Sequence, residues 1–357
     1  MVGIYDGVHQ TPQYQDSGIM FLSVENITTL KSEKYISEEA FERDYKVYPE
    51  KGDILMTRIG DVGTTNVVQT KEKVAFYVSL ALLKPKEINS YFLSNAMKTS
   101  VFQKGLRERT LVTAIPQKIN KDEIGRVNVF ITNNAEEQKK IGDYFTALDH
   151  LITLHQRKCD ETKQLKKFML QKMFPKNGEK NPKIRFEGFT DDWEQRKLGD
   201  VFKEYSEKHH EELPALTIVQ GGGTIFREES DRSLQYDKSN LSGYKMVKKD
   251  DFIVHLRSFE GGLEKANSDG IISPAYHTMH GDNVDSRFYY PYFRSYDFIN
   301  RKLVAHVYGI RDGRSIDIDG MKSIEIPYTS YEEQKTIGDY LDSLDHLITL
   351  HQRKCCE

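Results

Sequence analysis

Cysteine, tryptophan and long apolar runs are scarce in this chain of 357 residues. The three cysteines, Cys159, Cys355 and Cys356, form no CxxC motif, and two of them are adjacent, so a disulfide framework is not indicated. The longest apolar run, residues 74–83, is too short to cross a bilayer. No basic region followed by an apolar stretch opens the chain, so we expect no signal peptide. These absences predict a reduced, cytoplasmic protein that does not contact a membrane.

Catalytic motifs are missing as well. The chain contains no Pro-Pro dipeptide, as adenine methyltransferases require, no Pro-Asp dipeptide of a typical nuclease motif and no GxxxxGK[ST] phosphate loop. The run Gly221–Gly223 has no surrounding fingerprint, so we interpret it as a turn or a loop beside DNA. No cysteine stands near His209-His210 or near His277 and His280, and we predict exposed loop histidines there and no metal site. The net charge of −3 neither indicates nor excludes nucleic-acid binding.

An internal repeat is the strongest feature of the sequence. Residues 136–159 (EEQKKIGDYFTALDHLITLHQRKC) and residues 332–355 (EEQKTIGDYLDSLDHLITLHQRKC) differ at only four positions. Weaker matches surround the repeat and pair residues 51–56 with 249–254, Tyr91-Phe92 with Tyr292-Phe293, and 126–130 with 323–327. Each half is therefore predicted to contain strands, a helix, more strands and one long helix. A fixed scaffold that carries two diverged domains has this pattern.

The repeated segments have the features of long helices. Asn133 and Asn134 precede the first copy and Thr329 or Ser330 the second, as N-cap residues do. Apolar residues then recur at steps of four and three, which predicts a heptad seam. The seam consists of Ile141, Phe145, Leu148 and Ile152 in the first copy and of Ile337, Leu341, Leu344 and Ile348 in the second. The simplest partner of one helix is the other, most naturally antiparallel; an intermolecular coiled coil is the alternative.

The fold class that follows is α+β, with two mixed α/β domains joined by long helices that form an antiparallel coiled coil. The first helix meets no proline until Pro175, and residues 175–190 contain two prolines and two glycines, which is typical of a linker. The expected order is a first domain at 1–132, a long helix at 133–174, the linker at 175–190, a second domain at 191–328 and a second helix at 329–357.

Several segments together resemble the specificity subunits of type I restriction-modification enzymes. The run Pro182–Phe189 followed by Trp193–Asp200 resembles the start of a target-recognition domain in that family. The Glu-Glu-Gln-Lys-x-Ile segments at Glu136 and Glu332 look like its central and C-terminal conserved regions, and residues 6–14 are similar to a turn near the start of a first recognition domain. Compared with the family, the first domain is expected to be N-terminally trimmed and the second helix truncated.

The resemblance implies a non-catalytic chain that reads DNA. Each recognition domain would bind one half of a split, asymmetric site on double-stranded DNA, and the helices would set the spacing of the half-sites. Two methylation subunits and the restriction subunits would be its partners. S-adenosylmethionine, ATP and Mg would be used by those partners, and no cofactor by this chain.

Candidate DNA-contacting residues are those able to reach phosphates or base edges. Arg58 and Arg257 are parallel candidates because each follows a matched strand, and Arg107–Thr110 is expected in a stretch that links strands. The full set is His9, Gln10, Thr11, Thr57, Arg58, Arg107, Arg109 and Thr110 in the first domain, and Arg257, Ser258, Tyr276, His277, Tyr308, Arg311, Arg314 and Ser315 in the second.

Other function classes remain open at this point. A coiled-coil interaction protein would explain the helices but not two diverged domains of matched layout. A free-standing methyltransferase or nuclease lacks its motifs. A degenerate or recombined specificity fragment fits the trimmed ends.

Overall fold

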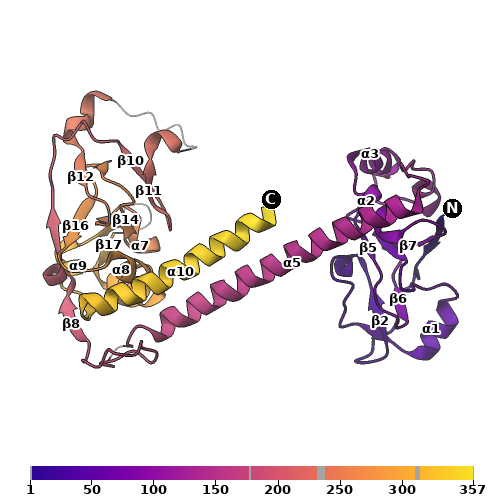
Figure 1. Ribbon diagram of the computed structural model, residues 1–357, viewed down its shortest axis with the longest axis horizontal. Helices are drawn as coiled ribbons and strands as arrows, with labels where there is room; N and C mark the ends of the chain where they lie inside the picture. The colour runs from indigo at the N-terminus through magenta and orange to yellow at the C-terminus, as the bar shows by residue number, and fades with distance from the viewer. Residues whose placement is uncertain (1, 177, 231–237, 310–313, 357) are drawn as a thin grey trace. The chain divides into compact units, whose positions relative to one another are not determined.

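The computed structural model describes residues 2–176, 178–230, 238–309 and 314–356. Its contacts divide the chain into two compact units, Met1–Thr153 and Leu154–Glu357, called here the first and the second unit. Each unit combines strands and helices, and a long helix follows the strands in each half, as predicted (Figure 1). Within the described ranges, no helix has the length and apolarity that a membrane span requires.

The first unit is built on an antiparallel sheet with the strand order β1-β7-β4-β5. Side chains alternate along its central strands, so Ile54 and Met56 pack with α2 and α3, whereas Leu55 packs with α1 and the small sheet β3-β2-β6. Both faces of the central strands are therefore buried, which accounts for the apolar run at residues 74–83. The elements are β1 Val2–Asp6, β2 Ile19–Leu22, β3 Tyr35–Ile36, α1 Glu38–Asp44, β4 Ile54–Thr57, β5 Thr65–Val67, β6 Val74–Phe76, β7 Leu80–Pro85, α2 Ser90–Met97, α3 Ser100–Arg109 and α4 Lys121–Ile124.

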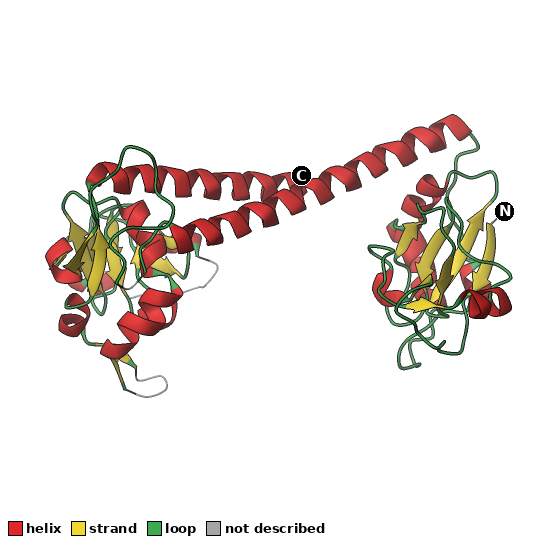
Figure 2. Cartoon of the chain, turned by 90° about the horizontal axis from the view of Figure 1, so that it is seen from below, coloured by secondary structure: helices red, strands yellow, loops and turns green. Residues whose placement is uncertain are grey.

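The second unit repeats this plan around the antiparallel sheet β14-β13-β16-β9 (Figure 2). Its core is aromatic: Phe202 and Phe252 meet edge to face with ring centroids 5.3 Å apart, and Phe293 packs against both. Its strands are β8 Glu194–Lys197, β9 Phe202–Tyr205, β10 Leu216–Val219, β11 Gly223–Phe226, β12 Lys245–Val247, β13 Phe252–Val254, β14 Glu264–Lys265, β15 Gly270–Ile272, β16 His277–Gly281, β17 Val307–Tyr308, β18 Ser315–Ile316 and β19 Glu325–Tyr328. Its shorter helices are α6 Leu198–Val201, α7 Ser258–Gly261, α8 Ser286–Phe293 and α9 Ile318–Lys322.

Helices α2 and α8 occupy matching places, and they correct one sequence match. Each begins 196 residues from the other, at Ser90 and Ser286, which is the offset of the long repeat. Tyr91 therefore corresponds to Arg287, and the match of Tyr91-Phe92 with Tyr292-Phe293 was wrong in register. Helix α8 carries aromatic residues along most of its length because several of its sides are buried. An aromatic pair alone therefore does not determine the register.

The two repeated segments form α5 (Ala135–Lys172) and α10 (Tyr331–Cys356). Asn134 Oδ1 accepts the backbone N–H groups of Glu136 and Glu137, which confirms an asparagine cap. Ser330 Oγ accepts the N–H of Glu333 at 3.4 Å, so the serine has the capping role in the second copy. Early glutamates in both helices also favour the positive end of the helix dipole.

From Leu154 onward, α5 runs antiparallel to α10. His155 Nδ1 lies 3.1 Å from His351 Nδ1, the Cys159 thiol approaches the Ile348 carbonyl, and Lys166 Nζ is 2.5 Å from the Asp345 carboxylate. Figures 1 and 2 both show the later part of α5 alongside α10. His155 and His351 are the same residue of the repeat, so a local two-fold axis passes between them. The predicted antiparallel pair is confirmed for this part of α5.

The predicted seam is only half right. Ile337, Leu341 and Leu344 are buried, but Ile337 and Leu341 belong to the core of the second unit, where Met173 joins them. In the first copy, Phe145 is exposed, and Ile141, Leu148 and Ile152 are half-buried, as Ile348 is in the second. Because the two helices run antiparallel and cross at His155 and His351, the early residues of α10 lie against the late residues of α5. They do not lie against the equivalent early residues of α5. The heptad spacing identified the apolar face correctly but not the residues that cover it.

Candidate nucleic-acid interface

Each unit is docked on its long helix by the same glutamine of the repeat. In the first unit, Gln138 Oε1 accepts the N–H of Asn89 at 2.9 Å, and its Nε2 donates to the carbonyl of Thr132 at 2.7 Å. Gln334 makes the same two bonds in the second unit, to the N–H of Asp285 at 3.0 Å and to the carbonyl two residues before α10 at 2.7 Å. Both glutamines are buried, so these bonds tie the start of α2 and of α8 to the helix beneath.

A glycine four residues later allows the close approach. A Cβ atom on Gly142 would lie 2.7 Å from Asn89 Oδ1, and one on Gly338 would lie 3.1 Å from Asp285 Oδ1. Sequence reasoning missed these glutamines and glycines as functional residues. The signal was present, because both residue types are identical in the two copies of the repeat.

Each unit also carries a short antiparallel pair of segments, called here its hairpin, beside the loop or helix that follows its central strand. In the first unit, Leu111 pairs with Lys118, and Lys118 also bridges to Ile59 just after β4. In the second unit, Tyr308 pairs with Ser315, and β18 contacts α7, which follows β13. The two hairpins thus occupy equivalent places with different side chains.

The structure brings most of the second unit's candidates together at this hairpin. Arg257 is exposed at the N-cap of α7, with its Nε 3.2 Å from Glu260. The Arg314 guanidinium lies 5.2 Å from the ring centroid of Phe259 in the same helix. Tyr308 and Ser315 are exposed on the two strands of the hairpin. Arg311 lies outside the described residues.

The first unit's candidates form two groups. Arg107, Arg109 and Thr110 end α3 and lead into the hairpin, so the prediction of a strand-linking stretch was wrong. Arg107 is exposed, whereas Arg109 donates to a helix carbonyl at 3.1 Å, as does Thr110 at 2.8 Å. The second group, His9, Gln10 and Thr11, is exposed in the segment after β1.

Three candidates are buried and are engaged inside the fold. Thr57 Oγ1 accepts the N–H of Thr64 at 2.9 Å, and Ser258 Oγ accepts the N–H of His255 at 2.9 Å. Arg58 forms an ion pair with Asp6, and burial lowers its pKa. Arg58 and Arg257 are therefore not parallel, because one is enclosed and the other faces solvent. A side chain that follows a strand can be satisfied by a distant partner that sequence spacing does not reveal.

Tyr276 and His277 lie at the start of β16. The Tyr276 ring is half-buried against His255, with centroids 6.2 Å apart, and burial raises the pKa of its hydroxyl. His277 Nδ1 lies 2.7 Å from Glu204, and His280 Nδ1 lies 2.6 Å from Asp251. These two histidines are in a strand with carboxylate partners, so the prediction of loop histidines holds only for His209-His210.

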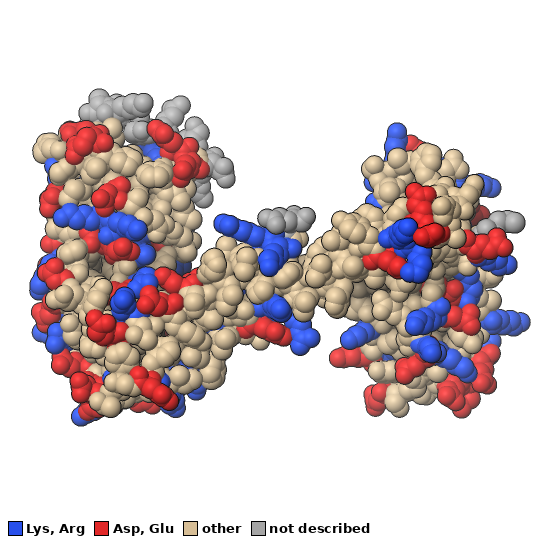
Figure 3. All heavy atoms as spheres, viewed as in Figure 1, with Lys and Arg blue, Asp and Glu red and all other residues tan. Residues whose placement is uncertain are grey.

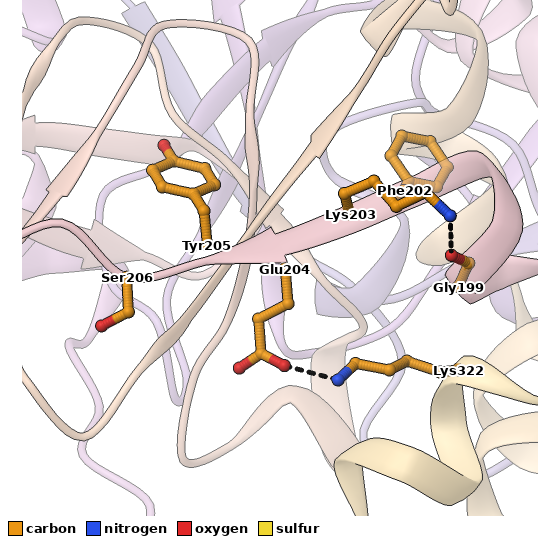
Figure 4. Close-up of a pocket in the computed structure, with 7 residues that line it drawn as sticks. All are labelled: Gly199, Phe202, Lys203, Glu204, Tyr205, Ser206 and Lys322. Carbon is orange, nitrogen blue, oxygen red and sulfur yellow. Dashed lines mark hydrogen bonds and ion pairs between the residues drawn. The ribbon is translucent and has the colours of Figure 1, made fainter.

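A cavity of about 430 Å³ opens beside β9 (Figure 4). Its lining is Gly199, Phe202, Lys203, Glu204, Tyr205, Ser206 and Lys322. Burial acts to raise the pKa of Glu204, but hydrogen bonds from Lys322 and His277 outweigh it and the pKa is lowered. Lys322 Nζ is 2.5 Å from Glu204, so the two charges neutralise each other. The cavity therefore offers no unpaired charge of this pair to a ligand.

The Gly221–Gly223 run is a turn between β10 and β11 that already holds an anion of the protein itself. The Glu264 carboxylate accepts the N–H of Gly221 at 2.8 Å and that of Gly223 at 3.1 Å. It also accepts the hydroxyl of Tyr290 at 2.7 Å and pairs with Arg294. Because these amides point at Glu264, they are not available to a phosphate, and the interpretation as a turn is confirmed.

Charge is mixed over the visible surface of each unit. Figure 3 shows Lys and Arg interspersed with Asp and Glu on that face of both units. Individual arginines near the hairpins, rather than a broad field of one sign, are therefore the candidates for DNA contact.

Known proteins resemble the chain over nearly its whole length. Residues 11–164 and 190–355 match the family model of the type I restriction modification DNA specificity domain. The putative type I restriction enzyme MjaX specificity subunit of Methanocaldococcus jannaschii is 24% identical over 323 residues, which cover 85% of this chain and 74% of the relative. The MjaVIII specificity subunit of the same organism is 25% identical over 291 residues, or 76% of this chain and 67% of the relative.

A solved structure supports the fold. The crystal structure of the type I restriction-modification system S subunit from M. genitalium superposes with a TM-score of 0.60 at 13% identity, covering 99% of this chain and 90% of that one. The fold class predicted from the sequence is confirmed. Because the family model matches the chain twice and the two matches together span most of it, the chain belongs to the type I restriction-modification DNA specificity family.

Proposed function

We propose that each unit reads one half of a bipartite, asymmetric site on double-stranded DNA, with recognition domains at 1–132 and 191–328. The repeated docking supports this proposal most directly. Gln138 and Gln334 fix two domains to two copies of one helix in the same way, whereas the hairpins that the domains present differ in sequence. Two domains that are docked in the same way but present different side chains suit a split DNA site whose two halves differ in sequence.

The hairpin surfaces have side chains suited to the two kinds of DNA contact. Arg257 and Arg314 in the second unit and Arg107 in the first are exposed cations for phosphates or for guanine edges. Tyr308 and Ser315 add hydroxyl groups for base edges or the sugar–phosphate backbone. The buried residues Thr57, Arg58 and Ser258 are reassigned to holding these surfaces in place.

The partners follow from the duplication. Two helix segments of nearly identical sequence repeat most of their exposed side chains, which suits two copies of one methylation subunit. Restriction subunits would complete the cytoplasmic complex. We assign S-adenosylmethionine, ATP and Mg to those partners and no cofactor or catalytic step to this chain.

A methylome tests the proposal. The chain is co-expressed with its cognate methylation subunit in a host that lacks adenine methylation, and the modified bases of the genome are sequenced. Two short specified blocks separated by a fixed unspecified run are the expected result. A symmetric motif built from one block would mean that only one unit reads DNA and that the assembly has dimerised, which would contradict the proposal. No methylation despite a stable complex would also contradict it and would favour a degenerate specificity fragment.

A further inference from the structure

The loop between β10 and β11 presents a single side chain. Val219 pairs with Gly223 where the two strands end, so residues 220–222, which read Gln-Gly-Gly, form the connecting loop. Gln220 is exposed, and the two residues that follow it have no side chain. A ligand that meets the tip of this loop therefore meets the carboxamide of Gln220 and otherwise only backbone.

The backbone of this loop is held in place by two side chains of the same unit. Two of its amides donate to the buried Glu264 carboxylate, and the carbonyl of Gly222 accepts Asn267 Nδ2 at 2.7 Å. The Gly222 N–H donates to the Val219 carbonyl at 2.9 Å. Burying a carboxylate is unfavourable unless it is well paired, so its use to fix an exposed loop indicates that the position of this loop matters.

The side chain of Gln220 lies against α7, at a glycine that leaves room for it. A Cβ atom on Gly261 would lie 2.3 Å from Gln220 Nε2 and 3.0 Å from its Cδ. Gly261 ends a helical turn and its φ is not positive, so the backbone conformation does not require glycine there. The contact with Gln220 does explain it. Within the described ranges, no hydrogen bond occupies the amide of Gln220, so its donor and acceptor are left for a ligand.

Gln220 lies on the same side of α7 as Arg257. Gly261 follows Arg257 by four residues and its N–H donates to the Arg257 carbonyl at 3.3 Å, which places the two positions one above the other on the turn. The Arg257 side chain is 71% exposed. An arginine and a glutamine are the side chains that pair bidentately with guanine and with adenine in the major groove. Their neighbourhood here predicts direct reading of bases.

We propose that Gln220 is a specificity-determining residue that reads an adenine in the major groove of the half-site bound by the second unit. The inference rests on the proposed function and deepens it. The amide oxygen of Gln220 accepts from N6 of the adenine, and its amide nitrogen donates to N7, a pairing that the other bases do not offer. Gly261 and Glu264 are positioning residues, because the first leaves room for the amide and the second holds the loop.

The test uses the full chain in complex with its methylation subunit and the duplex site found by the methylome. Each adenine of the specified blocks, on either strand, is replaced in turn by 7-deazaadenine, which keeps base pairing but lacks the N7 acceptor. Gln220→Ala should weaken binding to the unmodified duplex about 5-fold or more in an anisotropy titration. At one adenine, the replacement should weaken binding by the unaltered chain but should cause no further loss in Gln220→Ala.

Gly261→Ala disturbs the glutamine from a buried position that does not itself reach DNA. It should weaken binding to the unmodified duplex as Gln220→Ala does, and it should add nothing when both substitutions are present. Gln195→Ala is the matched control, at an exposed glutamine of β8 in the same unit, and should leave binding unchanged. The urea transition of Trp193 should stay in place in all these variants, which shows that the second unit remains folded.

The outcomes separate this inference from the proposed function. A preferred DNA sequence in which no adenine is coupled to Gln220 would overturn the inference alone. An effect of Gly261→Ala that persists in the Gln220→Ala chain would also overturn it, because the glycine would then not act through the glutamine. A complex with no preferred DNA sequence would overturn the proposed function and this inference with it.

Discussion

Gln138 and Gln334 are equivalent, so the same substitution can be made at either one, and each variant should destabilise a different unit. Gln334→Ala removes both partners of two buried backbone groups, the N–H of Asp285 and the carbonyl that precedes α10. Leaving a buried group without a partner costs about 1–3 kcal/mol, so the two together should lower the free energy of unfolding of the second unit by about 2–6 kcal/mol. That is a large fraction of the stability of an ordinary domain.

The only tryptophan makes the measurement specific. Trp193 is buried in the second unit, where it donates to Glu333 in the first turn of α10, so its fluorescence in a urea titration reports that unit. Gln334→Ala should move the Trp193 transition to lower urea. Gln138→Ala should leave that transition in place, and it should speed hydrogen exchange at the amide of Asn89 in the first unit.

Two results would refute the reasoning. A shift of the Trp193 transition by Gln138→Ala as large as that by Gln334→Ala would mean that the glutamines do not act locally. A cost below about 1 kcal/mol for Gln334→Ala would mean that water or a rearranged side chain replaces the lost bonds. Gln334→Met, which keeps the volume but not the polar atoms, separates lost hydrogen bonds from a cavity.

Three further predictions address charge. Glu264→Gln removes the buried charge opposite its arginine partner, and thermal unfolding should show a loss of about 3–5 kcal/mol in the second unit. Desolvation lowers the pKa of His155, and so do the positive charges nearby. The unfolded chain therefore takes up the proton at a higher pH than the folded chain does, and the helix pair should lose stability as the pH falls below about 6.5. Circular dichroism should show this loss, with a weaker pH dependence in His351→Gln. Arg314→Ala should weaken binding to one half-site about 10-fold or more in an anisotropy titration, whereas Arg301→Ala, at an exposed cation of the same unit, should not.

The sequence predicted the helical scaffold well because its determinants are local. Cap residues, heptad spacing and near-identity of the copies lie within short stretches, and they located α5 and α10 to within a few residues. The antiparallel direction followed from the repeat itself. What covers each apolar face did not follow, because Leu341 and Phe145 are both apolar and occupy the same position of the same pattern, yet one is buried and the other exposed.

The candidate site was harder to predict because exposure depends on partners far away in the chain. Arg58 is enclosed by a pairing with Asp6, 52 residues earlier, and nothing in the local sequence distinguishes it from the exposed Arg257. Ser258 stands beside Arg257 yet points into the fold. The glutamine and glycine that dock each unit were visible only as identities of the repeat, whose meaning required the contacts with α2 and α8.

The carboxylate of Glu264 within the Gly221–Gly223 turn has a consequence for the entropy of recognition. A turn that becomes ordered only when a ligand reaches it loses chain freedom on binding, and that loss weakens the affinity. Here the anion is part of the chain, so the turn becomes ordered during folding. Val219 and Phe226, which are exposed at either side of the turn, therefore project from a backbone that is already ordered. A ligand that binds at this edge does not have to order the turn, so its affinity is not reduced by that entropic cost. The concentration of salt should have little effect on the conformation of the turn.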